Sequence, residues 1–116
     1  MPKPLSPLGL GKLACRLALE KKALDPLLLD MRPLTTITDF FLILAAESEP
    51  QIKAIANHIE KELKKAQAIS PSIDGFPKSQ WMIMDYGSLI IHIFHKDKRA
   101  YYSLETLWGD AKRITP

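Results

Sequence analysis

The stretch Trp81–Phe94, WMIMDYGSLIIHIF, decides the fold class of this chain. Its two halves, Trp81–Asp85 and Leu89–Phe94, are rich in large apolar and β-branched residues, and Tyr86 and Gly87 lie between them. Runs of this kind joined by a short glycine-containing turn are typical of paired antiparallel strands. The stretch therefore predicts a β-hairpin, which other elements of the chain must cover.

Two further apolar runs precede the hairpin, at Leu27–Met31 and at Phe40–Ala45. A Thr-rich segment that ends at Asp39 separates them, so we expect two strands that lie antiparallel as neighbours. Because both runs are apolar at consecutive positions, helices or a partner surface should cover both of their faces. The turn-rich segment Ile73–Pro77 predicts no more than an edge strand.

Apolar residues at helical spacing predict three helices that alternate with the strands. The first covers about Leu8–Ala23 and ends ahead of Pro26. The second starts with the capping-box residues Ser48 and Gln51. A short third helix is expected over residues 101–109. Strands interleaved with helices predict an α/β fold.

Chain length limits the number of domains. With 116 residues and a mass of 13.1 kDa, the chain is long enough for one hydrophobic core and too short for two. We therefore expect a single α/β domain over residues 1–116, built on a β-sheet of about five strands flanked by helices. The proline-rich residues 1–7 are expected to form a flexible arm.

Composition and charge exclude several classes of protein. The charged fraction of 25% is ordinary for a soluble domain, and no apolar run approaches the ~20 residues that cross a bilayer, so no membrane partner is expected. The single cysteine, Cys15, has no partner for an internal disulfide, which favours a cytoplasmic location. Its apolar helical face predicts a buried side chain rather than a nucleophile. The net charge of +3 permits a nucleic-acid or ribosome partner without selecting one.

Motifs for catalysis, metal binding and cofactor binding are sparse. Glycine-rich phosphate loops of the GxGxxG or GxxxxGK[ST] type are absent from the sequence. His92 and His95 lie three residues apart on a predicted strand, which turns their rings to opposite sides and disfavours a shared metal. His92 is expected to be a partly buried ring held by a neighbouring polar group. Four carboxylates share a position at predicted strand ends, where turn geometry is favoured over metal or acid–base chemistry: Asp30, Asp39, Asp74 and Asp85.

Large aromatic residues gather in the last third of the chain: Trp81, Tyr86, Tyr101, Tyr102 and Trp108. Acidic residues accompany them at Asp85, Glu105 and Asp110. Aromatic side chains with a polar atom serve both in cores and in interfaces. Any that are exposed would form the centre of a protein-binding face, and the carboxylates would suit a basic partner such as a ribosomal protein.

Several motifs resemble the ribosomal silencing factor, or Iojap, family, and they occur in the order of that family: Leu29–Arg32, Thr38–Phe41, Met84–Ser88, Ile91–His95 and Tyr102–Asp110. The resemblance extends over about Leu10–Ala111. It implies an α/β fold with a mixed sheet, related in outline to nucleotidyltransferases but without their catalytic motif. The sequence contains no Asp-x-Asp pair for a divalent metal. We therefore expect no enzymatic activity, no cofactor and no small-molecule substrate.

The same resemblance implies a function. Members bind the large ribosomal subunit through its universal protein fourteen, sterically block association with the small subunit, and so repress translation in starvation or stationary phase. A role in large-subunit biogenesis and a homodimer in the free state are further expectations. Carried over onto matching positions, the partner-binding residues are Asp39, Asp74, Trp81, Asp85, Tyr86, His95, Tyr102, Leu104, Glu105 and Trp108.

Two other classes of function stay open on the residues alone. One is a residual nucleotide-handling module that uses the strand-end aspartates with a metal, which the missing Asp-x-Asp pair disfavours. The other is an RNA-binding module, for which Glu60 and Glu62 interrupt a stripe of positive charge on the second predicted helix. That stripe comprises Lys53, Lys61, Lys64 and Lys65.

Overall fold

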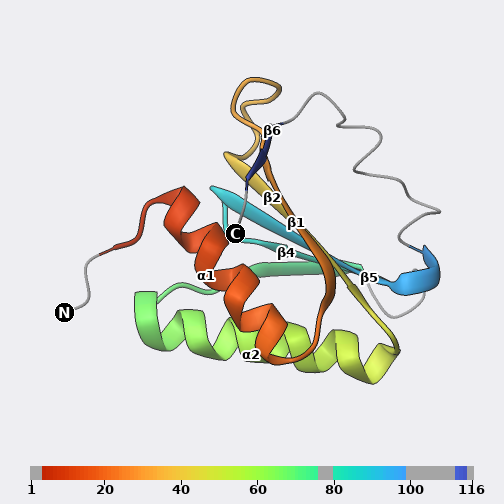
Figure 1. Cartoon of the computed structure of the whole chain (residues 1–116). Coiled ribbons are helices and arrows are strands. Elements are labelled where there is room, and N and C mark those ends of the chain that lie inside the picture. The colour runs from red at the N-terminus through yellow and green to blue at the C-terminus, as the bar shows by residue number, and fades with distance from the viewer. Residues whose placement is uncertain (1–3, 76–79, 99–111, 115–116) are drawn as a thin grey trace.

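The computed structural model describes residues 4–75, 80–98 and 112–114, and it shows one sheet with two helices packed against it (Figure 1). The elements in chain order are α1 Pro7–Glu20, β1 Leu24–Asp30, β2 Phe40–Ala46, α2 Glu49–Gln67, β3 Ser72–Gly75, β4 Trp81–Asp85, β5 Leu89–His95 and β6 Lys112–Ile114. The single α/β domain predicted from the sequence is confirmed. The helix predicted over residues 101–109 lies outside the described residues.

Within the described residues the sheet has six strands, in the order β3-β4-β5-β2-β1-β6. Strands β2 and β5 pair in parallel, whereas the other neighbours pair antiparallel, so the predicted mixed sheet is confirmed. The predicted hairpin is β4–β5, with Trp81 opposite Phe94 and Asp85 opposite Ile90. The described residues add β6 to the five strands that the sequence predicts, because its three residues carry no apolar run that would distinguish them from a loop.

Strand β1 begins three residues earlier than its apolar run. Leu24 pairs with Ala45 and Leu27 pairs with Ile43, so β1 carries one extra residue between these pairs. Pro26 lies inside this β-bulge, which is one of the few places in a sheet where a missing N–H donor is tolerated. The proline therefore marks a bulge within β1 and not the boundary of the strand.

Both helices begin at a side-chain cap, and the sequence predicts the one at Ser48. The Ser48 hydroxyl accepts the N–H of Gln51 at 3.2 Å, which satisfies one of the free donors of α2, and the Gln51 side chain accepts the N–H of Glu47, just ahead of the cap, at 2.6 Å. Ser6 caps α1 in the same way. Of the arm expected over residues 1–7, the structure places Pro7 inside α1, and the N–H of Leu5 donates to the Gln67 side chain at 2.8 Å.

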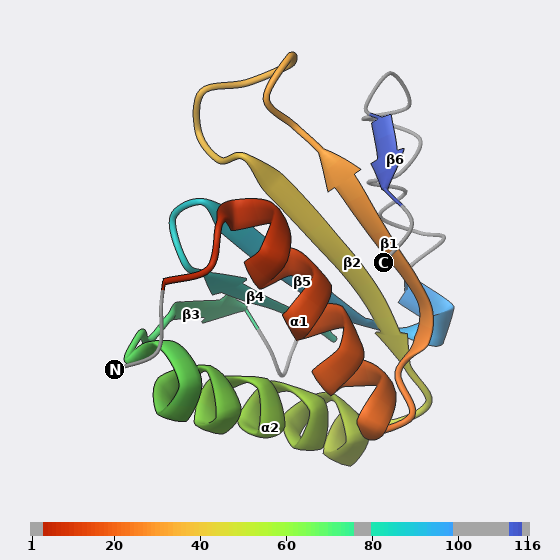
Figure 2. The ribbon, with the colours of Figure 1, turned by 60° about the vertical axis from the view of Figure 1, so that its left-hand side comes forward.

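Helices α1 and α2 lie side by side on one face of the sheet (Figure 2). We call this the helical face. Its core is almost entirely aliphatic, and Ala14 of α1, Ile59 of α2 and Leu44 of β2 are all 0% exposed within it. Helix α1 approaches β1 closely at Gly11, where an added Cβ would lie 2.9 Å from a methyl carbon of Leu28. A side chain at residue 11 would force Leu28 or the helix to shift.

Candidate functional site

Strand alternation sends a second set of side chains to the opposite face of the sheet. In β4, Met82 and Met84 pack into the core of the helical face, so Trp81, Ile83 and Asp85 leave the sheet on the other side. We call this the aromatic face. A separate core cluster lies on it, formed by Leu29, Met31, Ile43 and Phe94 with Leu27, Phe41 and Trp81 packed against them. The aromatic face is where the sequence-predicted interface residues of β4 are found.

Four aromatic rings form the centre of this face. Trp81 stacks on Phe94 with ring centroids 5.0 Å apart, and the edge of Phe41 meets His92 at 4.6 Å. The indole N–H of Trp81 donates to Nδ1 of His92 at 3.1 Å. Strands β2, β4 and β5 each contribute to the group, because the registers Trp81–Phe94 and Ile43–His92 bring the same face of all three strands together. The half-buried Trp81 is the ring of β4 that reaches the surface.

His92 is the buried polar group of the cluster, with 6% of its surface exposed. Because Nδ1 accepts from the indole, the ring proton belongs on Nε2, which has no hydrogen-bond partner in the described part of the chain. Burial lowers the pKa of His92 to about 4. The ring is therefore neutral at neutral pH, and the expectation of a partly buried histidine tied to a polar neighbour is confirmed.

Two exposed carboxylates flank the aromatic rings on the same face. Asp74 on the edge strand β3 lies opposite Ile83, and Asp85 ends β4. Each uses one oxygen in a turn, since Asp74 accepts the N–H of Gly75 at 2.7 Å and Asp85 accepts that of Gly87 at 2.7 Å. The turn roles predicted for these strand-end aspartates are confirmed, and their charges stay at the surface.

The other two strand-end aspartates have different surroundings. Asp30 accepts two hydrogen bonds from the Arg32 guanidinium at 2.9 and 2.7 Å, and this guanidinium holds the pKa of the carboxyl below its usual value. Asp39 is half-buried just ahead of β2, where its backbone bonds to Met31 and Ser88. Among the described residues, no three His, Cys, Asp or Glu side chains lie where they could together hold a metal ion.

Tyr86 and His95 point away from the aromatic rings. Tyr86 follows β4 and packs against the core of the helical face, where its buried hydroxyl has no partner among the described residues and burial raises its pKa well above the usual range. His95 ends β5 opposite Ala46, a residue of the helical face, and its Nδ1 accepts the N–H of Asp97 at 3.1 Å. The rings of His92 and His95 therefore leave β5 on opposite sides, as predicted.

The predicted interface residues thus spread along the sheet. Asp39, Asp85 and Tyr86 gather at the amino ends of the parallel strands β2 and β5, whereas Trp81 and His95 lie at their carboxyl ends. At roughly 3.3 Å per residue, the seven residues of β5 span about 20 Å, whereas Trp81 and Asp85 of β4 lie about 13 Å apart on the aromatic face. An extended surface of this kind suits a macromolecular partner better than a small ligand.

Part of the predicted site cannot be placed, and part of the observed site was missed. Tyr102, Leu104, Glu105 and Trp108 lie outside the described residues. Sequence reasoning did not assign Phe41, His92 or Phe94 to the site, although their alternation with core positions on β2 and β5 places them beside Trp81. The described helices are too short or too polar to cross a membrane.

Comparison with known proteins identifies the family. A family model described as ribosomal silencing factor during starvation matches residues 6–116. The chain is 40% identical over 95 residues to a ribosomal silencing factor of Halalkalibacterium halodurans, covering 82% of this chain and 81% of that protein. It is 39% identical over 100 residues to a ribosomal silencing factor of Bacillus subtilis, covering 86% and 85%. A solved structure from Chromobacterium violaceum matches with a TM-score of 0.85 at 27% identity, covering 97% of this chain and 91% of that one. This chain therefore belongs to the family of ribosomal silencing factors.

Proposed function

We propose that this chain binds the large ribosomal subunit through its aromatic face and sterically blocks the small subunit from joining, which represses translation. One observation carries the proposal: a half-buried tryptophan on a rigid cluster of rings, flanked by the exposed carboxylates of Asp74 and Asp85. Tryptophan anchors in a preorganised setting are typical centres of binding energy in protein interfaces. The names of the relatives, ribosomal silencing factors, point to the ribosome as the partner.

The charges of this face favour a basic protein as the contacted component. We propose the universal ribosomal protein fourteen of the large subunit in this role. Asp74 and Asp85 would steer and orient such a partner, since surface charges contribute more to the association rate and to specificity than to affinity. Neither charge is neutralised by a described ion pair.

The proposed action requires no catalytic group. The domain measures 40 × 32 × 23 Å along its principal axes, which is large enough to obstruct a contact between subunits when it is anchored beside that contact. Binding alone would thus silence the subunit. The effect should be reversible and should follow occupancy, since no bond is made or broken.

Co-sedimentation of the full chain with isolated large subunits tests the proposal, with small subunits added to score joining. The variant Asp74→Asn/Asp85→Asn removes both charges, while each amide oxygen can still accept its glycine N–H. We expect binding to weaken about tenfold at low salt, by the size of typical interface charge effects. Glu62→Gln, which removes a negative charge from the opposite side of the molecule, is the matched control.

Two outcomes would contradict the proposal. Absence of selective binding to large subunits at low salt would remove the ribosome as partner, and binding that leaves joining unchanged would remove the steric mechanism. A second variant, Glu105→Ala, tests the predicted interface residues that lie outside the described ranges, and we expect it to weaken binding. An unchanged affinity in that variant would restrict the interface to the strands.

We also propose that the free chain forms a homodimer through the aromatic face. A half-exposed tryptophan beside apolar strand residues is a surface that tends to self-associate. Sedimentation velocity at increasing concentration should then show a dimer that large subunits dissociate. A dimer that persists on the large subunit would show that a surface other than the aromatic face mediates self-association.

A further inference from the structure

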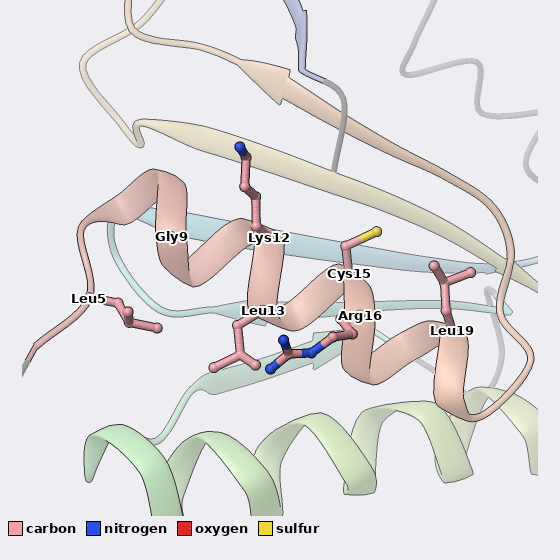
Figure 3. A pocket seen from close by; sticks show the side chains of 7 residues that line it. All are labelled: Leu5, Gly9, Lys12, Leu13, Cys15, Arg16 and Leu19. Carbon is pink, nitrogen blue, oxygen red and sulfur yellow. The ribbon is translucent and has the colours of Figure 1, made fainter. Parts of the chain in front are cut away.

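A groove runs along the outer side of α1, the side that faces away from the sheet (Figure 3). Its volume is about 520 Å³. The lining residues are Leu5, Gly9, Lys12, Leu13, Cys15, Arg16 and Leu19. Leu5, just ahead of α1, and Leu19, in its last turn, lie at the two ends of the groove and are 43% and 48% exposed. Helix α1 therefore presents an apolar outer side in addition to its buried one.

The two glycines of α1 differ in a way that concerns this groove. Gly11 is required by packing, because an added Cβ would lie 2.9 Å from Leu28. At Gly9 the nearest atoms to an added Cβ are Ser6 Oγ at 3.4 Å and Leu5 Cβ at 3.6 Å, which are ordinary contacts. A helical glycine costs about 0.5–1 kcal/mol relative to alanine, and no close contact explains this one. The absence of a side chain at Gly9 keeps the groove open.

Two cations flank the groove. Figure 3 shows Lys12 and Leu19 projecting from one side of α1, and Leu13 and Arg16 from the other. Lys12 and Arg16 are exposed and one helical turn apart, and neither makes an ion pair or hydrogen bond with another described residue. Cys15 is 0% exposed and belongs to the floor, and burial raises the pKa of its thiol.

We propose that this groove docks an acidic amphipathic helix of a second protein. The length from Leu5 to Leu19 corresponds to about 20 Å, or roughly four turns of a partner helix at 1.5 Å per residue. Leucines of that helix would fill the space above Gly9, and its carboxylates would pair with Lys12 and Arg16. The groove lies on the outside of the helical layer, opposite the aromatic face, so both surfaces can be occupied at once.

Charge complementarity selects this occupant over others. A nucleic acid would need a longer row of cations than two, and it would leave the leucines uncovered. An anionic membrane would need an apolar surface that projects, whereas this one is recessed. A second copy of the chain would have to present an acidic helix, and the outer side of α2 carries lysines at residues 53, 61, 64 and 65.

A labelled synthetic helix tests the proposal by fluorescence anisotropy with the full chain. The probe has about 14 residues, with leucines at i, i+3, i+4 and i+7 and glutamates beside them, and its control carries lysine at every glutamate position. We expect saturable binding of the acidic probe, weakened about tenfold or more by Gly9→Leu and by Lys12→Glu/Arg16→Glu. Gly9→Ala should bind like the parent chain, because a methyl group fills little of the groove.

Matched variants distinguish an effect on the groove from an effect on folding or on the aromatic face. Lys61→Glu/Lys64→Glu on α2 and Asp74→Asn/Asp85→Asn should both leave probe binding unchanged. Unfolding curves should show Gly9→Leu to be no less stable than the parent, because leucine is the better helix former. If Gly9→Leu does unfold the chain, the variant Lys12→Glu/Arg16→Glu alone tests the inference.

Several results would overturn the inference. One is the absence of saturable binding of the acidic probe, and another is equal binding of the lysine control. Equal loss in Gly9→Ala and Gly9→Leu would attribute the effect to the helix and not to the groove. If the chain does not bind the probe but binds phosphatidylglycerol vesicles in a way that depends on Gly9 and Arg16, the occupant of the groove is a membrane. If it instead self-associates with the same dependence, the occupant is a second copy of the chain.

Discussion

The two faces of the central sheet are built from different residues and serve different ends. On the helical face, mostly aliphatic side chains of β2, β4 and β5 pack against α1 and α2. On the aromatic face, Trp81 and His92 share a hydrogen bond, and Asp74 and Asp85 keep their charges at the surface. The first face carries most of the stability. The second places polar and aromatic groups where a partner can reach them, at some cost in stability.

The largest expected effect is on the helical face. Ile59→Ala in α2 removes a side chain that is 0% exposed and should lower the free energy of unfolding by about 2–5 kcal/mol through lost burial and a new cavity. Ile37→Ala, at a position 78% exposed, is the control and should change it by less than about 0.5 kcal/mol. Urea denaturation measures both, and similar losses in the two variants would contradict this account of the core.

The next effect concerns pH and belongs to the aromatic face. The pKa of His92 is lowered from 6.5 to about 4 in the folded chain, so between these values the unfolded chain binds a proton that the folded chain does not. Stability should therefore fall as the pH falls through this window, by about 3 kcal/mol in all at 1.36 kcal/mol per pKa unit, and should level off above it.

Urea denaturation between pH 4 and 7 checks this pH dependence. His92→Gln, which keeps an acceptor for the Trp81 N–H, should flatten the profile in this range. A variant that keeps the slope of the parent chain would show that another group titrates and that His92 is not buried in the neutral form.

A smaller effect is expected when the hydrogen bond between the two rings is removed. Trp81→Phe keeps a ring stacked on Phe94 but deletes the donor to Nδ1 of His92, which should cost about 1 kcal/mol. Nitrogen chemical shifts of the histidine ring should also move, because Nδ1 is no longer held as the acceptor. Unchanged shifts would mean that the indole does not select the tautomer.

The smallest effect returns to the helical face. Tyr86→Phe removes a buried hydroxyl that has no partner among the described residues, so stability should stay level or rise by up to about 1 kcal/mol. Thermal unfolding measures the change. A clear loss of stability would show that the hydroxyl is bonded and that this edge of the core is less apolar than the structure indicates.

The elements of the fold and the residues of the site could be predicted from the sequence to different extents. The hairpin, the capped helix α2 and the neighbouring strands β1 and β2 all follow from local patterns, and Asp74 and Asp85 were assigned to turns correctly. Strand β6 has too little local signal to be found, and the bulge at Pro26 imitates a strand end. In the site, Trp81 was predicted to lie on the partner-binding face, whereas His92 and Phe41 were not assigned to it, because only the sheet register brings them together with Trp81.

The sequence by itself therefore determined the two helices, the longer strands and the fold class, since capping, turn and periodicity signals act within a few residues of each other. Its ordered motifs also indicated the family. Only the tertiary structure decided which strands far apart in the chain are neighbours, such as the parallel pair β2 and β5, and which side chains share a face. It also decided that Tyr86 and His95 turn away from Trp81, and that Lys12 and Arg16 flank a groove. These properties depend on contacts between segments far apart in the chain, which no local pattern encodes.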